Sequence, residues 1–371
     1  MSAKPKPAMD DQSVVRRILE HIERRTTDLG EDVWREPVEH YRSHERFAAE
    51  LRLLRRYPVP FCPSAALAET GAYIAREAAG TPLLVVRGSD GVVKAFRNAC
   101  RHRGMQVAEG AGCKKAFACR YHGWTYGLDG GLKRIPHEEG FPGLDMSEHG
   151  LVPVKAEERN GIVFVTQDSP GRALEELPPL IGPEQRYYGH AESVVEANWK
   201  IFLEGFIEGY HIRSTHPETF LPYGFDNLNV IDIFGRNSRV TYPFRRIRKL
   251  AELPESERKV TGFLTYVYQL FPNVLVTRLS SHTNLVILEP LEIDRTKMIT
   301  YSLTNSDAPG ALEEAKRDAA FVSTTGTAED REVVCAIQRG LASGANDVFT
   351  FGKFESAIAH FHRTLAAALG N

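Results

Sequence analysis

Two short segments in the first half of the chain pair a cysteine with a histidine at metal-ligand spacing. One reads C-x-H and the other C-x-x-H, and their donor residues are Cys100, His102, Cys119 and His122. A thiolate and an imidazole on one loop can bind a metal, and two such loops can close around one centre. Two centres fit this donor set: a structural zinc site, or a [2Fe–2S] cluster in which two histidines replace two cysteines on one iron.

The residues beside these pairs favour the iron–sulfur cluster. Gly104 follows the first pair and Gly123 the second, and glycine lets backbone amides come close to the cluster sulfurs. The C-x-H spacing also differs from the C-x₂₋₄-C and H-x₃₋₅-H ligand spacings of ordinary zinc fingers. The other three cysteines lack a histidine at short range, so we expect ordinary buried thiols at Cys62, Cys113 and Cys335.

A second group of potential ligands follows the segment Asn198-Trp199-Lys200 and reads E-x-x-H-x₄-H. The pattern predicts a helix over Trp199–His211, which would place Glu208 and His211 on one face. His216 lies five residues after His211, so a local break is needed to bring both imidazoles to one metal. Two histidines and a carboxylate form the facial triad of non-haem Fe(II) oxygenases.

Both motifs closely resemble those of the catalytic (α) subunits of Rieske non-haem iron oxygenases, the ring-hydroxylating dioxygenase family. The loops C-R-H-R-G and C-R-Y-H-G-W resemble its cluster signature, and the order along the chain is also the same. Arg101 and Arg120 stand where many members carry proline, at positions that do not ligate, and could serve to dock an acidic electron donor. The resemblance implies a [2Fe–2S] cluster and one mononuclear Fe(II) per chain.

The resemblance also implies the third iron ligand. In the family this ligand comes from a C-terminal helix, and the segment 329–341 looks like that helix. Asp330 falls at the expected position, with Glu329 and Glu332 as fallbacks.

The resemblance assigns Glu208 a different role. The family's acid at this position bridges the first iron histidine, here His211, to a cluster histidine of a neighbouring subunit, here His122. A carboxylate that accepts hydrogen bonds from two metal-bound imidazoles fixes both rings. Because the two centres of one chain would lie too far apart, a head-to-tail ring, and hence a homotrimer, is implied.

The expected fold class is α+β: a small antiparallel β Rieske [2Fe–2S] domain and a larger domain with an antiparallel sheet and flanking helices, of helix-grip type. Apolar residues at helical spacing predict helix from Ser13 to about Arg56, and glycine-punctuated apolar runs predict short strands after it. We expect an N-terminal helical segment over 1–57 packing with the catalytic domain, a Rieske domain over 58–170 and a catalytic iron domain over 171–371.

Composition narrows the partners and the location. The 371 residues carry a formal net charge of −2, which gives no reason to expect nucleic acid or an anionic membrane surface. We find no apolar stretch near the roughly 18 residues that a spanning helix needs. An odd number of cysteines argues against a disulfide framework, so a cytoplasmic location is expected.

The expected reaction uses O₂, two electrons and an organic substrate. No G-x-G-x-x-G follows a predicted strand, so the electrons must come from a separate ferredoxin or flavin reductase. Apolar and aromatic residues after the iron motif favour a small aromatic or hydrophobic substrate; the candidates are Phe202, Phe206, Leu221, Tyr223, Phe225, Phe263, Tyr266, Tyr268 and Phe271.

Three alternatives remain open at this point. Glu rather than Asp at position 208, together with the stretch 337–341, looks like carnitine and betaine oxygenases, and an aromatic cage could hold a quaternary ammonium group. A zinc-bearing ligand-binding protein without catalysis would be colourless. An electron-transfer protein that has lost the mononuclear iron would be brown, with two irons per chain in place of three.

Overall fold

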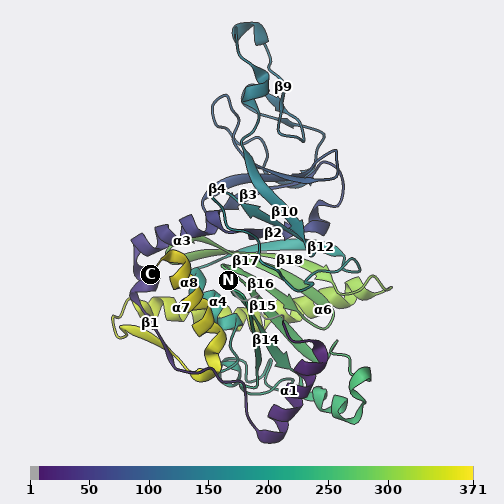
Figure 1. The fold of residues 1–371 in the computed structure, drawn as a ribbon, viewed down its shortest axis with the longest axis vertical. Coiled ribbons are helices and arrows are strands. Elements are labelled where there is room, and N and C mark those ends of the chain that lie inside the picture. Colours follow the sequence, from purple (N-terminus) through teal and green to yellow (C-terminus); the bar gives the residue numbers. More distant parts are fainter. Residues whose placement is uncertain (1–7, 371) are drawn as a thin grey trace, which may run out of the picture. The chain divides into compact units, whose positions relative to one another are not determined.

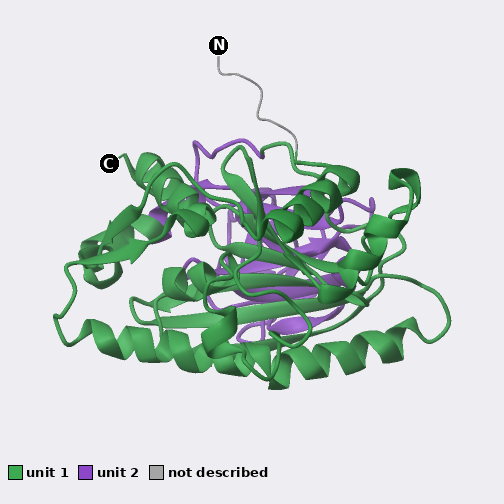
Figure 2. Cartoon of the chain, turned by 90° about the horizontal axis from the view of Figure 1, so that it is seen from below, with its two compact units in different colours: residues 1–50, 175–371 green, residues 51–174 purple. Residues whose placement is uncertain are grey.

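The computed structural model of the chain describes residues 8–370 and divides into two compact units (Figure 2). One unit spans Leu51–Leu174, and the other comprises the residues up to Glu50 together with those from Glu175 onward. The boundary near residue 50 falls inside helix α3 (His44–Arg56). Of the N-terminal segment predicted over 1–57, the described residues up to Glu50 belong to the same unit as the C-terminal half, and residues 51–57 belong to the smaller unit.

The smaller unit is built from antiparallel strands, as expected from its short apolar runs. Seven strands form one sheet in the order β2-β11-β10-β5-β4-β3-β6, and three form a second in the order β7-β8-β9. The strands are β2 (Val59–Pro63), β3 (Ala72–Ala78), β4 (Thr81–Arg87), β5 (Val93–Arg97), β6 (Gly110–Cys113), β7 (Phe117–Ala118), β8 (Thr125–Tyr126), β9 (Leu132–Arg134), β10 (Pro153–Arg159) and β11 (Ile162–Thr166).

The larger unit contains a seven-stranded antiparallel sheet in the order β12-β18-β17-β16-β15-β14-β13, labelled in part in Figure 1. Its central strands are rich in buried Val, Ile and Leu, the residue types that favour a sheet covered on its faces. The strands are β12 (Tyr187–Val195), β13 (Val230–Phe234), β14 (Asn237–Pro243), β15 (Leu264–Leu270), β16 (Val274–Arg278), β17 (His282–Glu292) and β18 (Arg295–Thr304).

Helices complete the larger unit. Helix α7 packs against α4, α5 and α6, and α8 packs against β13 and β14. The α-helices are α1 (Asp11–Arg24), α2 (Glu39–Arg42), α4 (Trp199–Phe206), α5 (Ile212–Thr215), α6 (Ala311–Thr324), α7 (Gly326–Leu341) and α8 (Ser356–Leu369). The 3₁₀ turns of the larger unit are η4 (Arg245–Glu252), η5 (Glu255–Glu257) and η6 (Lys353–Glu355), and those of the smaller unit are η1 (Ser64–Leu67), η2 (Glu138–Gly140) and η3 (Met146–His149). None of the helices within residues 8–370 has the length and apolar character needed to cross a bilayer.

Two sequence-based helix predictions are corrected by the structure. The N-terminal segment is not one continuous helix, because α1 ends at Arg24 and the short strand β1 (Trp34–Pro37) follows. That strand pairs with β19 (Val348–Phe351), more than 300 residues later, which no local pattern could indicate. The helix predicted over Trp199–His211 ends at Phe206, and the segment that follows is a loop.

Candidate metal centres

The two Cys-His loops of the smaller unit share one backbone construction. In each loop the cysteine N–H donates to the carbonyl five residues later: Cys100 to Met105 and Cys119 to Trp124, both at 2.8 Å. In each, the glycine four residues after the cysteine returns a hydrogen bond to the cysteine carbonyl, at 2.8 and 2.9 Å. Both glycines need positive φ, 80° at Gly104 and 74° at Gly123, which explains glycine at these positions. The difference between C-x-H and C-x-x-H spacing is therefore accommodated within matching loops.

The two loops bring the cysteines into the core and the imidazoles together. Cys100 and Cys119 are each 4% exposed, and the Cys100 Sγ lies 3.2 Å from the Tyr126 hydroxyl. The ring centroids of His102 and His122 are 4.7 Å apart. Burial, His122 and Arg103 lower the pKa of His102, which favours the neutral imidazole that metals bind. This donor set fits the Rieske cluster, with its thiolates inside and its imidazoles toward the surface.

The separation of the donors argues against a single zinc ion. Ligand atoms about 2.0–2.3 Å from one tetrahedral zinc cannot lie more than about 4.6 Å from one another. Across residues 8–370, the one group of three or more His, Cys, Asp or Glu whose ligand atoms all lie within 4.8 Å is found elsewhere, in the larger unit. Ligand atoms that bind two different irons of a [2Fe–2S] cluster can lie farther apart than ligand atoms that share one zinc.

The group in the larger unit consists of His211, His216 and Asp330. His216 Nε2 lies 2.9 Å and His211 Nε2 lies 3.5 Å from Asp330 Oδ1. The two histidines flank α5, and Asp330 lies in the first half of α7, which packs against α5. The structure thus brings together the two histidines and the carboxylate expected from the sequence, with both Nε2 atoms converging on one oxygen.

Each of these imidazoles is oriented by a carboxylate on its far side. His211 Nδ1 contacts Glu208 Oε1, and His216 Nδ1 lies 2.6 Å from Glu329 Oε2. An N–H donated from Nδ1 leaves the Nε2 lone pair free for a metal. The role of Glu329 is therefore different from the fallback ligand role considered from the sequence, and Glu332 is exposed.

The electrostatics of the site favour a cation. Burial lowers the pKa of His211, but its hydrogen bond to Glu208 and the charges of Glu208 and Asp330 raise it more, so the net shift is upward. Asp330 and Glu329 likewise outweigh burial and raise the pKa of His216. Both imidazoles thus respond to surrounding negative charge, which a bound divalent metal would neutralise. Two imidazoles and a carboxylate are the donor set of a non-haem Fe(II) site, so the residues present fit the iron.

The loop between α4 and α5 owes its shape to hydrogen bonds that local sequence does not reveal. Glu208 Oε2 accepts from the backbone N–H groups of Tyr210 and His211. The hydroxyl of the half-buried Tyr242 donates to the carbonyls of Phe206 and Glu208, at 2.8 and 3.0 Å. These contacts replace the helical hydrogen bonds that would otherwise continue past Phe206.

An aromatic residue missed in the sequence packs directly on the iron-site histidine. The ring centroids of Phe220 and His216 are 4.7 Å apart. A Cβ at Gly326, the first residue of α7, would lie 2.0 Å from the Phe220 ring, so only glycine admits this packing. The H-x₃-F spacing after the second histidine was the available signal.

The remaining cysteines differ in exposure. Cys62 is buried, and burial raises the pKa of its thiol to about 12. Cys113 is exposed and Cys335 is half-buried, so the expectation that all three are buried was wrong. The reason at Cys113 is its place on β6, the edge strand of the sheet.

Comparison with known proteins identifies the class. The family profile described as Ring hydroxylating alpha subunit (catalytic domain) matches residues 183–371, and that described as Rieske [2Fe-2S] domain matches residues 57–168. The chain belongs to the family of ring-hydroxylating α subunits, the Rieske non-haem iron oxygenases. It is therefore an oxidoreductase that uses a [2Fe–2S] cluster and a mononuclear iron.

The similar proteins include oxygenases for quaternary ammonium compounds. The chain is 27% identical over 363 residues to the carnitine monooxygenase oxygenase subunit of Escherichia coli (strain K12), covering 91% of this chain and 94% of the relative. It is 27% identical over 325 residues to the chloroplastic choline monooxygenase of Spinacia oleracea, covering 81% and 70%.

Solved structures agree on the fold. A quaternary ammonium Rieske monooxygenase in complex with L-carnitine superposes with a TM-score of 0.75 at 21% identity, over 99% of both chains. Naphthalene 1,2-dioxygenase from Rhodococcus sp. bound to indole gives a TM-score of 0.77 at 18% identity, over 96% of this chain and 98% of that one.

Proposed function

We propose that this protein is the oxygenase component of a monooxygenase acting on a small quaternary ammonium compound. The observation that carries the proposal is the similarity, over nine-tenths of the chain, to a carnitine monooxygenase subunit. Glutamate at position 208, where most aromatic-ring members have aspartate, supports the same choice. An aromatic substrate, the first expectation from the sequence, is the second candidate because naphthalene 1,2-dioxygenase shares the fold.

The surroundings of the iron-site residues suit a cationic substrate. The carboxylates of Glu208, Glu329 and Asp330 exceed the charge of one divalent iron by one negative unit. Phe220 packs on His216. The Tyr223 N–H donates to the Phe220 carbonyl at 3.0 Å, and the exposed Tyr223 ring packs edge-on against the exposed Phe321. Aromatic faces beside negative charge attract a trimethylammonium group that cannot donate hydrogen bonds.

Other aromatic candidates have structural roles. Tyr266 donates a hydrogen bond to Asp11, and the Arg239 guanidinium lies over the rings of both Tyr266 and Tyr268. Phe202 is buried and packs with Phe206. Because Phe220 packs directly on His216, we assign substrate contact to Phe220 and to its neighbours Tyr223 and Phe321.

In the proposed mechanism, Cys100, His102, Cys119 and His122 hold the cluster, and His211, His216 and Asp330 hold the iron. When bound, the two groups together supply electron transfer and O₂ activation. Glu208 and Glu329 keep both Nε2 atoms directed at the metal by accepting from Nδ1. The reaction consumes O₂, two electrons and two protons, forms a substrate C–OH bond and releases water.

Substrate-dependent O₂ uptake tests this proposal. With a surrogate reductase, carnitine, choline and glycine betaine are each compared with indole and naphthalene, and product is analysed after turnover in ¹⁸O₂. We expect uptake at least about tenfold above background with one or more quaternary ammonium compounds, and one labelled oxygen in the product. Uptake with the neutral aromatic compounds alone would overturn the assignment.

We further propose that the chain works as a homotrimeric ring in which Glu208 also meets His122 of a neighbouring copy. One similar structure is described as revealing inter-subunit electron transfer in a quaternary ammonium Rieske monooxygenase. His122 is exposed in the isolated chain, and one oxygen of Glu208 retains acceptor capacity beyond its contact to His211.

The electron donor in this proposal is an acidic ferredoxin or reductase domain. Residues 98–123 around the cluster loops carry five cationic side chains and one acidic side chain, a local net charge of about +4 in a chain whose net charge is −2. The cationic side chains, all exposed, are Arg101, Arg103, Lys114, Lys115 and Arg120.

Charge reversal tests the donor site. Arg101→Glu combined with Arg120→Glu should raise the KM for the donor at least about tenfold at low salt, because complementary charge steers the encounter. Lys155→Glu, on the exposed face of β10, is the matched control. Reduction by dithionite should be unchanged in both, and an unaffected donor KM in the double variant would contradict the acidic-donor proposal.

A further inference from the structure

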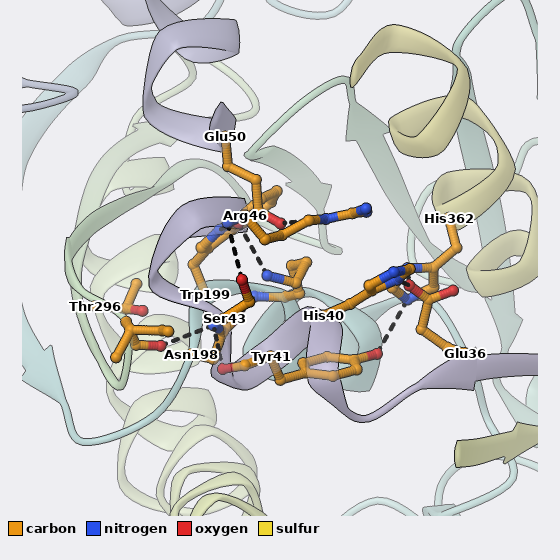
Figure 3. A network of polar contacts seen from close by, with 12 residues as sticks. Glu36, His40, Tyr41, Ser43, Arg46, Glu50, Asn198, Trp199, Thr296 and His362 are labelled. Atoms are coloured by element: carbon orange, nitrogen blue, oxygen red, sulfur yellow. Dashed lines mark hydrogen bonds and ion pairs between the residues drawn. The ribbon is translucent and has the colours of Figure 1, made fainter. Parts of the chain in front are cut away.

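A buried ionic network joins three parts of the larger unit that are far apart in the sequence (Figure 3). His362 of α8 lies between two carboxylates: its Nε2 is 2.9 Å from Glu204 Oε1, and its Nδ1 is 3.2 Å from Glu36 Oε1. The Tyr41 hydroxyl donates to the same Glu204 oxygen at 2.7 Å. All four residues are buried, at 1% to 6% exposure.

A proton on His362 offsets one of the two carboxylate charges of this network. Burial disfavours the imidazolium, but the hydrogen bond to Glu204 and the charges of Glu204 and Glu36 raise the pKa of His362 overall. Burial also works against the Glu36 carboxylate, yet its partners lower its pKa to about 2. Glu36 has further donors in His40, at 2.6 Å, and Trp34, at 2.9 Å. Glu204 has fewer donors, because within residues 8–370 its side-chain partners are Tyr41 and His362.

Glu204 lies in the last turn of α4, next to the loop of the iron site. The Ile207 N–H closes that turn on the Glu204 carbonyl at 3.1 Å. Glu208 follows directly, and its carboxylate contacts His211. A shift of the Glu204 side chain therefore reaches the iron-site residues through one short, hydrogen-bonded segment.

The other end of α4 is held by a separate buried contact. Glu50 accepts from Lys200 Nζ at 2.9 Å and from Trp199 Nε1 at 3.0 Å. Figure 3 shows Glu50 and Trp199 on the far side of the network from His362. Because these contacts fix the first turn of α4, the position of the helix can change mainly at its last turn, where Glu204 contacts His362.

Helix α8 also approaches the iron site independently. Glu355, the residue that caps the N-terminus of α8, lies seven residues before His362. Burial raises the pKa of Glu355 to about 7, and the negative charges of Glu208 and Glu204 add to that effect. The N-terminal end of α8 thus lies near the loop after α4, where the rings of Phe354 and Tyr210 also pack with centroids 4.4 Å apart.

We propose that His362 is a positioning residue for the mononuclear iron site, holding Glu204 at the end of α4 and through it the loop that carries Glu208 and His211. The inference rests on the ligand set of the proposed function but not on the substrate. It assigns a role to a residue 146 positions after the second iron histidine. If α8 contributed only by packing, its substitutions would change the stability of the protein but not the geometry of the iron site.

The test compares variants of the network in the full-length protein loaded with iron. His362→Gln and Glu204→Gln should change the electron paramagnetic resonance spectrum of the ferrous site with nitric oxide as probe. They should also lower cluster oxidation in a single turnover about ten- to a hundredfold, the scale expected for displaced reacting groups. Tyr41→Phe, which removes only one hydroxyl donor, should give a smaller change in the same direction and covers the case in which the other variants fail to fold.

Two matched controls separate positioning from stability. Glu36→Gln removes the other partner of His362 without touching α4, and His360→Gln makes the same exchange two residues away on α8. Both should leave the nitric oxide spectrum unchanged even where the melting temperature falls. An unchanged spectrum in His362→Gln and Tyr41→Phe, or an equal change in Glu36→Gln, would overturn the proposal. The nitric oxide probe needs no organic substrate. The spectra can therefore be interpreted even if the substrate screen of the proposed function fails.

Discussion

Replacing His211 by alanine is expected to leave about two irons per chain in place of about three, and to abolish O₂ uptake while the protein stays brown. His211 Nε2 is one of the two imidazole nitrogens that converge on Asp330 Oδ1. A site reduced to His216 and one carboxylate has lost a third of its protein ligands and one of its two imidazoles. The cluster donors all belong to the other compact unit, so the visible bands should persist.

Iron, acid-labile sulfide and zinc measured on the purified variant check this result. His190→Ala is the matched control, because His190 is an exposed histidine of β12 in the same unit. It should keep about three irons and full activity. A His211→Ala protein that kept all its iron would refute the ligand assignment, and a colourless starting protein containing zinc would refute the cluster assignment.

The cluster loops could be predicted from the sequence because their requirements are local. Each loop needs a cysteine, a histidine and a glycine with positive φ within five residues, and these residue types can be read directly from the sequence. The strands were predictable for a similar reason, since runs such as Pro82–Val86 alternate or bury apolar side chains over a few residues.

The iron-site loop was mispredicted because its structure depends on distant contacts. The three-residue spacing of Glu208 and His211 is compatible with a helix, and their contact is indeed present. It is made in a loop, however, which is held by Tyr242 from β14 and by the carboxylate of Glu208 itself. Neither contact can be read from the segment alone.

The three acids at the start of α7 illustrate the same limit. Glu329, Asp330 and Glu332 are all plausible ligands by type, and the family resemblance selected Asp330. The structure directs Asp330 at both imidazoles, Glu329 at His216 Nδ1, and Glu332 toward solvent. That division follows from the rotation of α7 against α5, which is a tertiary property.

Glu208→Gln is expected to keep both metal centres and yet slow substrate-dependent oxidation of the cluster in a single turnover at least about a hundredfold. The carboxylate now accepts from His211 Nδ1 with one oxygen and from two backbone N–H groups with the other. Glutamine offers one acceptor oxygen, so it cannot serve the His211 ring, the backbone and a second imidazole together. The iron should stay bound, because His211 Nε2 is not removed.

Two comparison variants show which function has been lost. Glu208→Asp keeps the charge and both oxygens, and should retain much more of the single-turnover rate. Glu329→Gln weakens the equivalent contact at His216 Nδ1, where no second imidazole is proposed, so it should reduce iron occupancy more than the rate per bound iron. Iron content, the reduced-cluster spectrum and stopped-flow oxidation are measured on all three. If Glu208→Gln retained both centres and a normal rate, the carboxylate would only orient His211, and the electron route between neighbouring copies would have to run elsewhere.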